Sequence, residues 1–157
     1  MSDDIKLESP VIFKENLINK KSLYFDVEGE PFAKQRPRAH KIGNFVSVYT
    51  PNETKKYEEK VRKFYKKIYG DFLLEGDLTV EVDGYFSIPK SATKTQKQLM
   101  LENKIPHTKK PDCDNMAKVC LDALNGVAYP DDAAITNLNV SKQYSQTAKV
   151  RITIIKN

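Results

Sequence analysis

Residues 112 to 132 hold a cluster of charged side chains that could bind a metal ion or a phosphate. It consists of Asp112, Asp114, Lys118, Asp122, Asp131 and Asp132. If a helix begins near Asp114, Lys118 shares a face with it, because residues four apart are neighbours on a helix. The amides and dipole of a helix N-terminus also favour a nearby anion. Carboxylates held together repel one another unless a cation joins them, and oxygen ligands suit a hard ion such as Mg²⁺ or Mn²⁺. The cluster therefore predicts a divalent metal site that handles phosphate.

The spacing leaves one choice in this cluster open. Adjacent residues of an extended chain point to opposite sides, so only one of Asp131 and Asp132 is expected to face the site. A structural role also explains some members singly, since aspartate is an ordinary N-cap and an Asp–Lys pair four residues apart is an ordinary surface ion pair. A structural role does not explain Asp112. It also does not explain Asp131 and Asp132, which follow a turn that contains Gly126 and Pro130.

Other catalytic chemistries have little support in the sequence. The residues available for zinc lack the usual ligand spacings, and they are His40, His107, Cys113 and Cys120. We expect His107 to be exposed in a loop and Cys120 to be a small core residue. No serine or cysteine nucleophile motif occurs, and the six glycines are scattered singly, which excludes a glycine-rich phosphate loop.

Composition indicates one soluble globular domain. The chain has 157 residues, of which 39% are hydrophobic, and its 26 basic and 21 acidic side chains give a net charge of +5. It has no apolar run of about 18 residues and no apolar signal-peptide core, so secretion and membrane insertion are not expected. On one helix the two cysteines would lie about 10.5 Å apart, beyond the roughly 7 Å limit for a disulfide. These features favour a reducing cytoplasm.

Hydrophobic periodicity predicts strands that alternate irregularly with helices. Strands are expected near residues 23–28, 45–49, 78–88 (with a bulge at Gly84), 135–144 and 149–155, and helices near 51–69, 91–103 and 114–125. The helix at 51–69 should begin with Thr50 as N-cap and Glu53 bonding back to it. Between the first two strands, Lys34 to Lys41 should form a basic loop, because Pro31 and Pro37 prevent a helix. The pattern predicts a single α/β (α+β) domain with a mixed sheet flanked by helices, over residues 23–157, after an N-terminal extension at 1–22.

Several strings resemble the signature of the RusA-type Holliday junction resolvases, which are often encoded by phages or prophages. They are KPDCDNMAK at 110–118, LDALNG at 121–126 and Asp131–Asp132, preceded by GEP at 29–31, KQRPR at 34–38 and YTP at 49–51 with Thr54. The resemblance covers about residues 23–144. Cys113 stands where the family usually has an aliphatic residue.

This resemblance implies a homodimeric, Mg²⁺-dependent endonuclease that cuts four-way DNA junctions in recombination and repair. The oxygen ligands would also accept Mn²⁺ as a substitute ion. It implies Asp112, Asp114 and Asp132 as metal ligands, so the family pattern chooses Asp132 over Asp131, and it gives Lys118 the catalytic lysine's place. Candidates for binding DNA phosphates are Lys34, Arg36, Arg38, Lys109, Lys110 and Lys142.

Three alternatives remain open at the level of sequence. The same carboxylates would serve a metal nuclease for flap or other branched DNA. The basic residues would equally suit a non-catalytic DNA-binding protein. In a phage structural protein, the net charge would signify only solubility.

Overall fold

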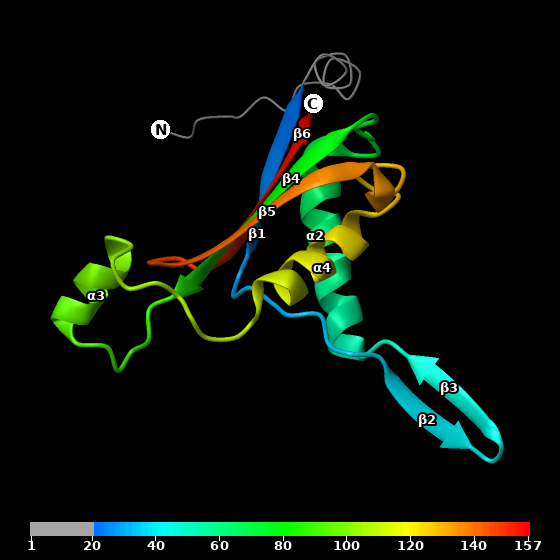
Figure 1. Ribbon diagram of the computed structural model, residues 1–157, viewed down its shortest axis with the longest axis horizontal. Helices are drawn as coiled ribbons and strands as arrows, with labels where there is room; N and C mark the ends of the chain where they lie inside the picture. Colours follow the sequence, from blue (N-terminus) through cyan, green and yellow to red (C-terminus); the bar gives the residue numbers. More distant parts are fainter. Residues whose placement is uncertain (1–20) are drawn as a thin grey trace, which may run out of the picture.

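A computed structural model describes residues 21–157, and its centre is a four-stranded mixed sheet, as predicted (Figure 1). The sheet consists of β1 (Ser22–Glu28), β6 (Lys149–Lys156), β4 (Leu78–Ser87) and β5 (Ile135–Ser145), in that order across the sheet. β6 runs antiparallel to both of its neighbours, whereas β4 and β5 are parallel. The proposed extension at 1–22 lies almost wholly outside the described residues, so the boundary at residue 23 stays a prediction.

Two helices cover one face of this sheet. α2 (Asn52–Tyr69) and α4 (Cys113–Leu124) lie side by side on it, while α3 (Lys94–Leu101) sits beyond one end of the sheet (Figure 1). A short helix, η1 (Asp132–Ala134), leads directly into β5. No helix within residues 21–157 is long and apolar enough to cross a membrane.

The core lies between the two helices and the inner face of the sheet. Leu23, Phe25 and Val27 alternate inward along β1, as the period-two pattern predicts, and Phe25 meets the ring of Tyr65 on α2 edge to face at 5.5 Å. The outer face of the sheet is polar. There Arg151 donates two hydrogen bonds to Asp26, at 2.7 and 3.0 Å, and these bonds lower the pKa of Asp26.

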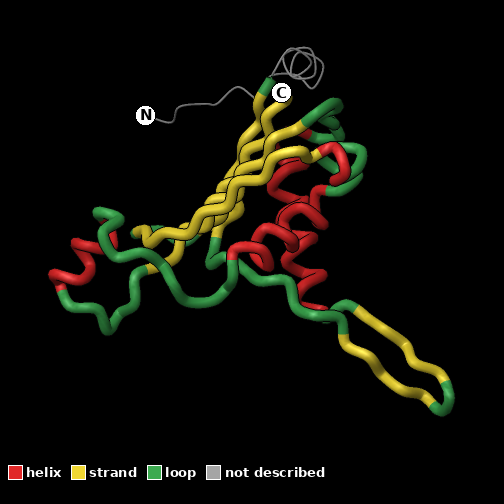
Figure 2. Tube along the Cα trace, viewed as in Figure 1, coloured by secondary structure: helices red, strands yellow, loops and turns green. Residues whose placement is uncertain are grey.

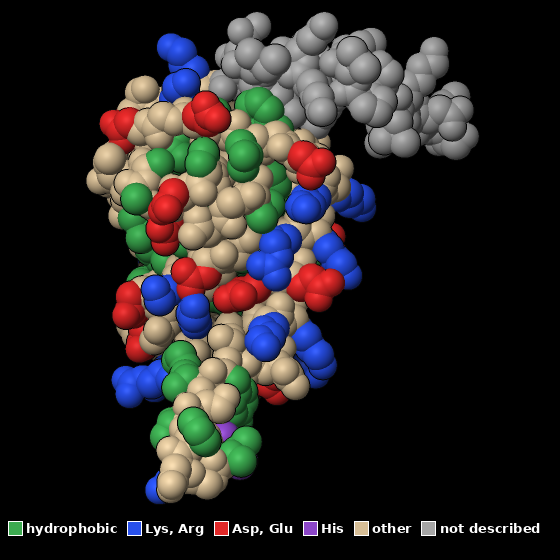
Figure 3. All heavy atoms as spheres, turned by 90° about the vertical axis from the view of Figure 1, so that its right-hand side faces the viewer, with side chains coloured by type: hydrophobic (Ala, Val, Ile, Leu, Met, Phe, Trp, Pro, Cys, Tyr) green, Lys and Arg blue, Asp and Glu red, His purple; other side chains and the backbone are tan. Residues whose placement is uncertain are grey.

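The remaining two strands form a separate hairpin that projects from the body beyond the start of α2 (Figure 2). β2 (Arg38–Ile42) and β3 (Phe45–Tyr49) pair antiparallel through a turn at Gly43, whose φ of +62° is one that glycine readily adopts. The prediction of a loop as far as Lys41 was therefore wrong from Arg38 onward. β2 forms by backbone pairing to β3. All side chains of both strands are exposed, so no burial pattern in the sequence revealed the strand. Hydrophobic side chains are visible on the projecting end of the molecule at the bottom of Figure 3.

The observed starts of α2 and α3 differ from the predicted ones. α2 has Pro51 as its N-cap and no side-chain capping bond, so the predicted Thr50 cap is wrong. Glu53 instead accepts a hydrogen bond from the side-chain amide of Gln35, at 3.0 Å, because the preceding chain folds back onto the helix. α3 is shorter than expected and begins with a capping box formed by Thr93 and Gln96.

Gly84 does not mark a bulge, contrary to the prediction. The irregularity between β4 and β5 lies at Leu78–Thr79 instead. A Cβ atom added at Gly84 would come within 2.5 Å of the sulfur of Met116, a fully buried residue of α4. Glycine at this position therefore permits the close approach of α4 to the sheet.

We expect the Gly84→Ala variant to lose about 1–3 kcal/mol of unfolding free energy, because the added methyl overpacks a closed core. Urea unfolding followed by circular dichroism measures this loss. Met116→Ala is the matched partner, since it removes the side chain that the methyl would strike. Simple additivity of the two losses in the double variant would show that this contact is not the cause.

Candidate active site

The outer face of α4 carries three of the predicted site residues in a row. Asp114, Lys118 and Asp122 are four residues apart, so each lies about 6 Å along the axis from the next. The opposite face, which includes Met116 and Cys120, is fully buried. Burial of the inner face thus presents the carboxylate of Asp114 and the ammonium of Lys118 to solvent, while Asp122 is only partly exposed.

Asp112 and Asp114 keep their carboxylates available for a ligand. Asp112 is the N-cap residue of α4 but makes no side-chain capping bond, and Asp114 lies in the first turn. The alternative in which Asp114 is an ordinary N-cap is therefore wrong. Within residues 21–157, neither carboxylate accepts a hydrogen bond or forms an ion pair with another side chain, and both residues are exposed.

The aspartate pair before β5 divides into two roles. Asp131 caps η1, since its carboxylate accepts a hydrogen bond from the backbone N–H of Ala133 at 2.9 Å. Asp132 lies within electrostatic range of Lys118 and Asp122 on α4. Its pKa is raised by a hydrogen bond shared with Asp131 and by the negative charges of Asp131 and Asp122, while Lys118 acts in the opposite direction.

The donor chemistry of these residues fits a hard divalent cation, because all the candidate ligands are carboxylate oxygens. In the part of the chain that the structure describes, however, no three acidic, histidine or cysteine side chains lie close enough together to share an ion. Like charges favour such separation when no cation lies between them. A single ligand set of Asp112, Asp114 and Asp132 stays a prediction.

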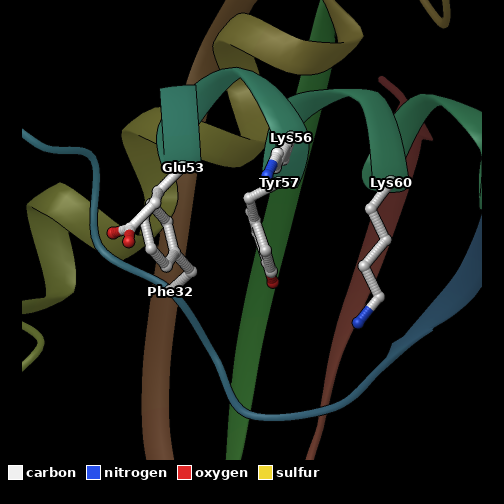
Figure 4. Close-up of a pocket in the computed structure, with 5 residues that line it drawn as sticks. All are labelled: Phe32, Glu53, Lys56, Tyr57 and Lys60. Carbon is white, nitrogen blue, oxygen red and sulfur yellow. The ribbon is translucent and has the colours of Figure 1, made fainter. Parts of the chain in front are cut away.

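The chain between β1 and β2, which we call the strap (residues 29–37), lies across both helices. Figure 4 shows Tyr57 and Lys60 extending from α2 toward the strap, with Phe32 on the strap beside Glu53. Phe32 stacks on Tyr57 with ring centroids 5.1 Å apart, at the edge of a pocket of about 310 Å³. The backbone N–H of Gln35 donates to the hydroxyl of Thr54 at 3.3 Å. These contacts fix the strap to α2.

Lys34 fixes the strap to α4 as well. Its backbone N–H donates to the carbonyl of Asn115 at 3.1 Å, and its ammonium pairs with Asp122 and lies 3.9 Å from Glu58. All three charged side chains are only about one-fifth exposed, at 21%, 25% and 16%. Lys34 therefore occupies an intramolecular ion cluster, and its predicted contact with DNA is untested. Glu58 was not among the predicted site residues, and it lies one turn after the buried Thr54.

Lys142 on β5 holds the segment that leads into Asp112. Its ammonium donates to the backbone carbonyls of Lys109, at 2.7 Å, and Pro111, at 2.9 Å. The sequence offered no signal for this contact, because it joins residues more than thirty positions apart. The other predicted DNA-binding residues are exposed, and they are Arg36, Arg38, Lys109 and Lys110.

His107 anchors the same segment and is buried, contrary to the prediction of an exposed loop residue. Its ring stacks on Phe86 with centroids 3.7 Å apart and meets Tyr144 edge-on at 5.0 Å. Nδ1 is buried without a hydrogen-bond partner in the described part of the chain. Burial, together with the positive charges of Lys142 and Lys109, lowers the pKa of His107 below its usual value.

Comparison with known proteins identifies the family of this chain. Residues 28–155 match the endodeoxyribonuclease RusA family, and the chain belongs to that family. It is therefore of the endodeoxyribonuclease class, whose RusA-type members generally depend on a divalent metal ion and act on branched DNA. The chain is also 33% identical over 132 residues to the uncharacterized protein YqaN of Bacillus subtilis (strain 168), with 83% of this chain and 93% of that protein covered.

The lowered pKa of His107 predicts a loss of stability in mild acid. Below pH 6.5 the unfolded chain binds a proton that the folded chain resists, so unfolding becomes easier as the pH falls toward the folded pKa. Urea midpoints measured between pH 7.5 and 5 should fall more steeply for the native protein than for His107→Phe, which keeps an aromatic ring without the charge. Parallel pH curves for the two proteins would contradict this account.

Lys142→Met should reduce DNA cleavage mainly through turnover. The variant leaves the carbonyls of Lys109 and Pro111 without their donor and so loosens the approach to Asp112, and losses of this kind cost about 10- to 100-fold in metal affinity or activity. Single-turnover rates and binding of branched DNA at several salt concentrations separate the two effects. Lys109→Met is the contrast, expected to weaken binding and to lower its salt dependence. If Lys142→Met did the same with normal turnover, Lys142 would be a phosphate contact.

Proposed function

We propose that this protein is a Mg²⁺-dependent endodeoxyribonuclease that resolves four-way DNA junctions by paired hydrolysis of phosphodiester bonds. The observation that carries the proposal is the exposed start of α4, where Asp112 and Asp114 have no side-chain partner within residues 21–157 and Lys118 lies one turn after Asp114. Membership of the RusA family supports the same chemistry.

In this proposal Asp112, Asp114 and Asp132 hold the metal ion, with Mn²⁺ able to replace Mg²⁺. Such an ion lowers the pKa of a bound water and draws charge from the scissile phosphate. Lys118 stabilises the negative charge that develops on the phosphate or on the departing oxygen, a role that suits a compact ammonium. The free oxygens of Asp112 and Asp114 support this assignment.

Resolution of a junction needs two symmetric cuts, and a twofold dimer with one site in each subunit matches that geometry. A homodimer is therefore part of the proposal. The exposed side chains of Arg36, Arg38, Lys109 and Lys110 would bind phosphates of the DNA arms, a contribution that does not depend on sequence and weakens with salt.

Asp114→Asn should lower junction cleavage by at least about a hundredfold, because the amide keeps the size of the side chain but removes its charge from the metal. The assay is a labelled four-way junction incubated with Mg²⁺ and then with EDTA. Asp71→Asn is the control, since Asp71 is 90% exposed and its only recorded partner, among residues 21–157, is Lys66 at 3.9 Å.

The outcomes distinguish the proposal from its alternatives. Equal cutting by native protein and Asp114→Asn would remove the metal-site assignment. Tight binding without any metal-dependent cutting would favour a non-catalytic DNA-binding protein. Faster cutting of a flap than of the junction would assign the same chemistry to another branched substrate.

A further inference from the structure

The β2–β3 hairpin (residues 38–49) exposes an unusual amount of apolar surface. Ile42, Val46 and Val48 are about two-thirds exposed and Phe45 is 81% exposed, while Tyr49 next to the body is 46% exposed. Single exposed apolar residues need no explanation, but five of them on one short projecting element indicate a binding surface. A two-stranded hairpin on its own is also only marginally stable in water, which favours a bound partner.

The register shows that both faces of the hairpin are available for contact. Ile42 lies directly opposite Phe45 on one face at the tip, and Arg38 lies opposite Tyr49 at its base. The other face carries the pairs Lys41–Val46 and Ala39–Val48. The hairpin is therefore a ribbon with apolar and basic side chains on both faces, rather than a sheet with a single apolar face.

The charge of this part of the chain identifies the kind of partner. Residues 31–52 contain four lysine and arginine side chains and not one acidic residue. A second copy of this chain, which carries a net charge of +5, is on balance a poor match for such a ribbon. DNA combines negatively charged phosphates with flat bases inside the helix. The phosphates suit the cations of the hairpin, and the bases suit its aromatic and aliphatic side chains.

The position of the hairpin links it to the candidate site. The strap leads directly into β2, and β3 leads into the first turn of α2 (Figure 1). The strap is bound to α4 by Lys34 and to α2 by Gln35. A ligand on the hairpin is therefore held in a defined direction relative to Asp114 and Lys118.

We propose that the hairpin enters the branch point of the DNA substrate, with Ile42 and Phe45 inserted among the bases and with Arg38 and Lys41 on the adjoining phosphates. A two-stranded ribbon fits a DNA groove, and apolar side chains can wedge between base steps. Bases at a branch point have incomplete stacking, so insertion costs least there. This inference rests on the proposed action on branched DNA and names the element that recognises the branch.

The test uses the full chain and a four-way junction with 2-aminopurine beside the branch point, in EDTA so that no strand is cut. Binding of the native protein should raise the fluorescence as the labelled base leaves its stack. Ile42→Ser/Phe45→Ser should lose this rise and bind the junction about tenfold more weakly, the size expected for one lost base–side-chain stack. Leu101→Ser on α3, 42% exposed and at the other end of the molecule, is the matched control and should behave as native.

Each outcome decides the inference independently of cutting. A full fluorescence rise with the double variant would overturn it, and so would failure of the native protein to bind the junction. Native protein that sediments as a dimer and a double variant that sediments as a monomer would assign the hairpin to a second copy instead. Absence of Mg²⁺-dependent cutting by the native protein would contradict the proposed function but not the role of the hairpin, because the fluorescence assay needs no catalysis.

Discussion

The closure of α4 against the sheet fixes the direction of every candidate catalytic group on that helix. Its inner residues are fully buried, and Gly84 lets the chain of β4 pass directly beneath Met116. A helix held this closely cannot rotate about its axis without opening a cavity, which a packed core resists. Asp114 and Lys118 therefore face solvent because of contacts on the other side of the helix.

A second constraint is electrostatic and acts along the same helix. The negative charge of Asp122 helps to raise the pKa of Asp132, and Asp122 is paired with Lys34 from the strap. Such partly buried pairs hold geometry more than they add stability, since desolvation offsets most of the attraction. The ion cluster of Lys34, Asp122 and Glu58 thus joins the strap, α2 and α4 into one support for the site.

The segment before Asp112 depends on contacts of a third kind. Aromatic stacking on His107 and the two hydrogen bonds from Lys142 fix residues 107–111 to the far ends of β4 and β5. In the proposed mechanism these contacts orient Asp112, the first of the proposed metal ligands along the chain. A rigid support of this type matters for catalysis because small displacements of a reacting group are costly.

Local patterns in the sequence determined much of this protein. The strands at 135–144 and 149–155 and the helix at 114–125 are found within one or two residues. For the strand at 149–155 and the helix the reason is that burial on one side leaves a period of two or of about 3.6. The placement of Asp114 and Lys118 one turn apart on the same face followed from that helix. Tertiary structure alone decided the pairing of Lys34 with Asp122, the burial of His107, the role of Lys142 and the strand at Arg38–Ile42. The first three depend on groups brought together from distant parts of the chain, and the strand depends on backbone pairing without burial. Neither cause produces a periodic pattern in the sequence.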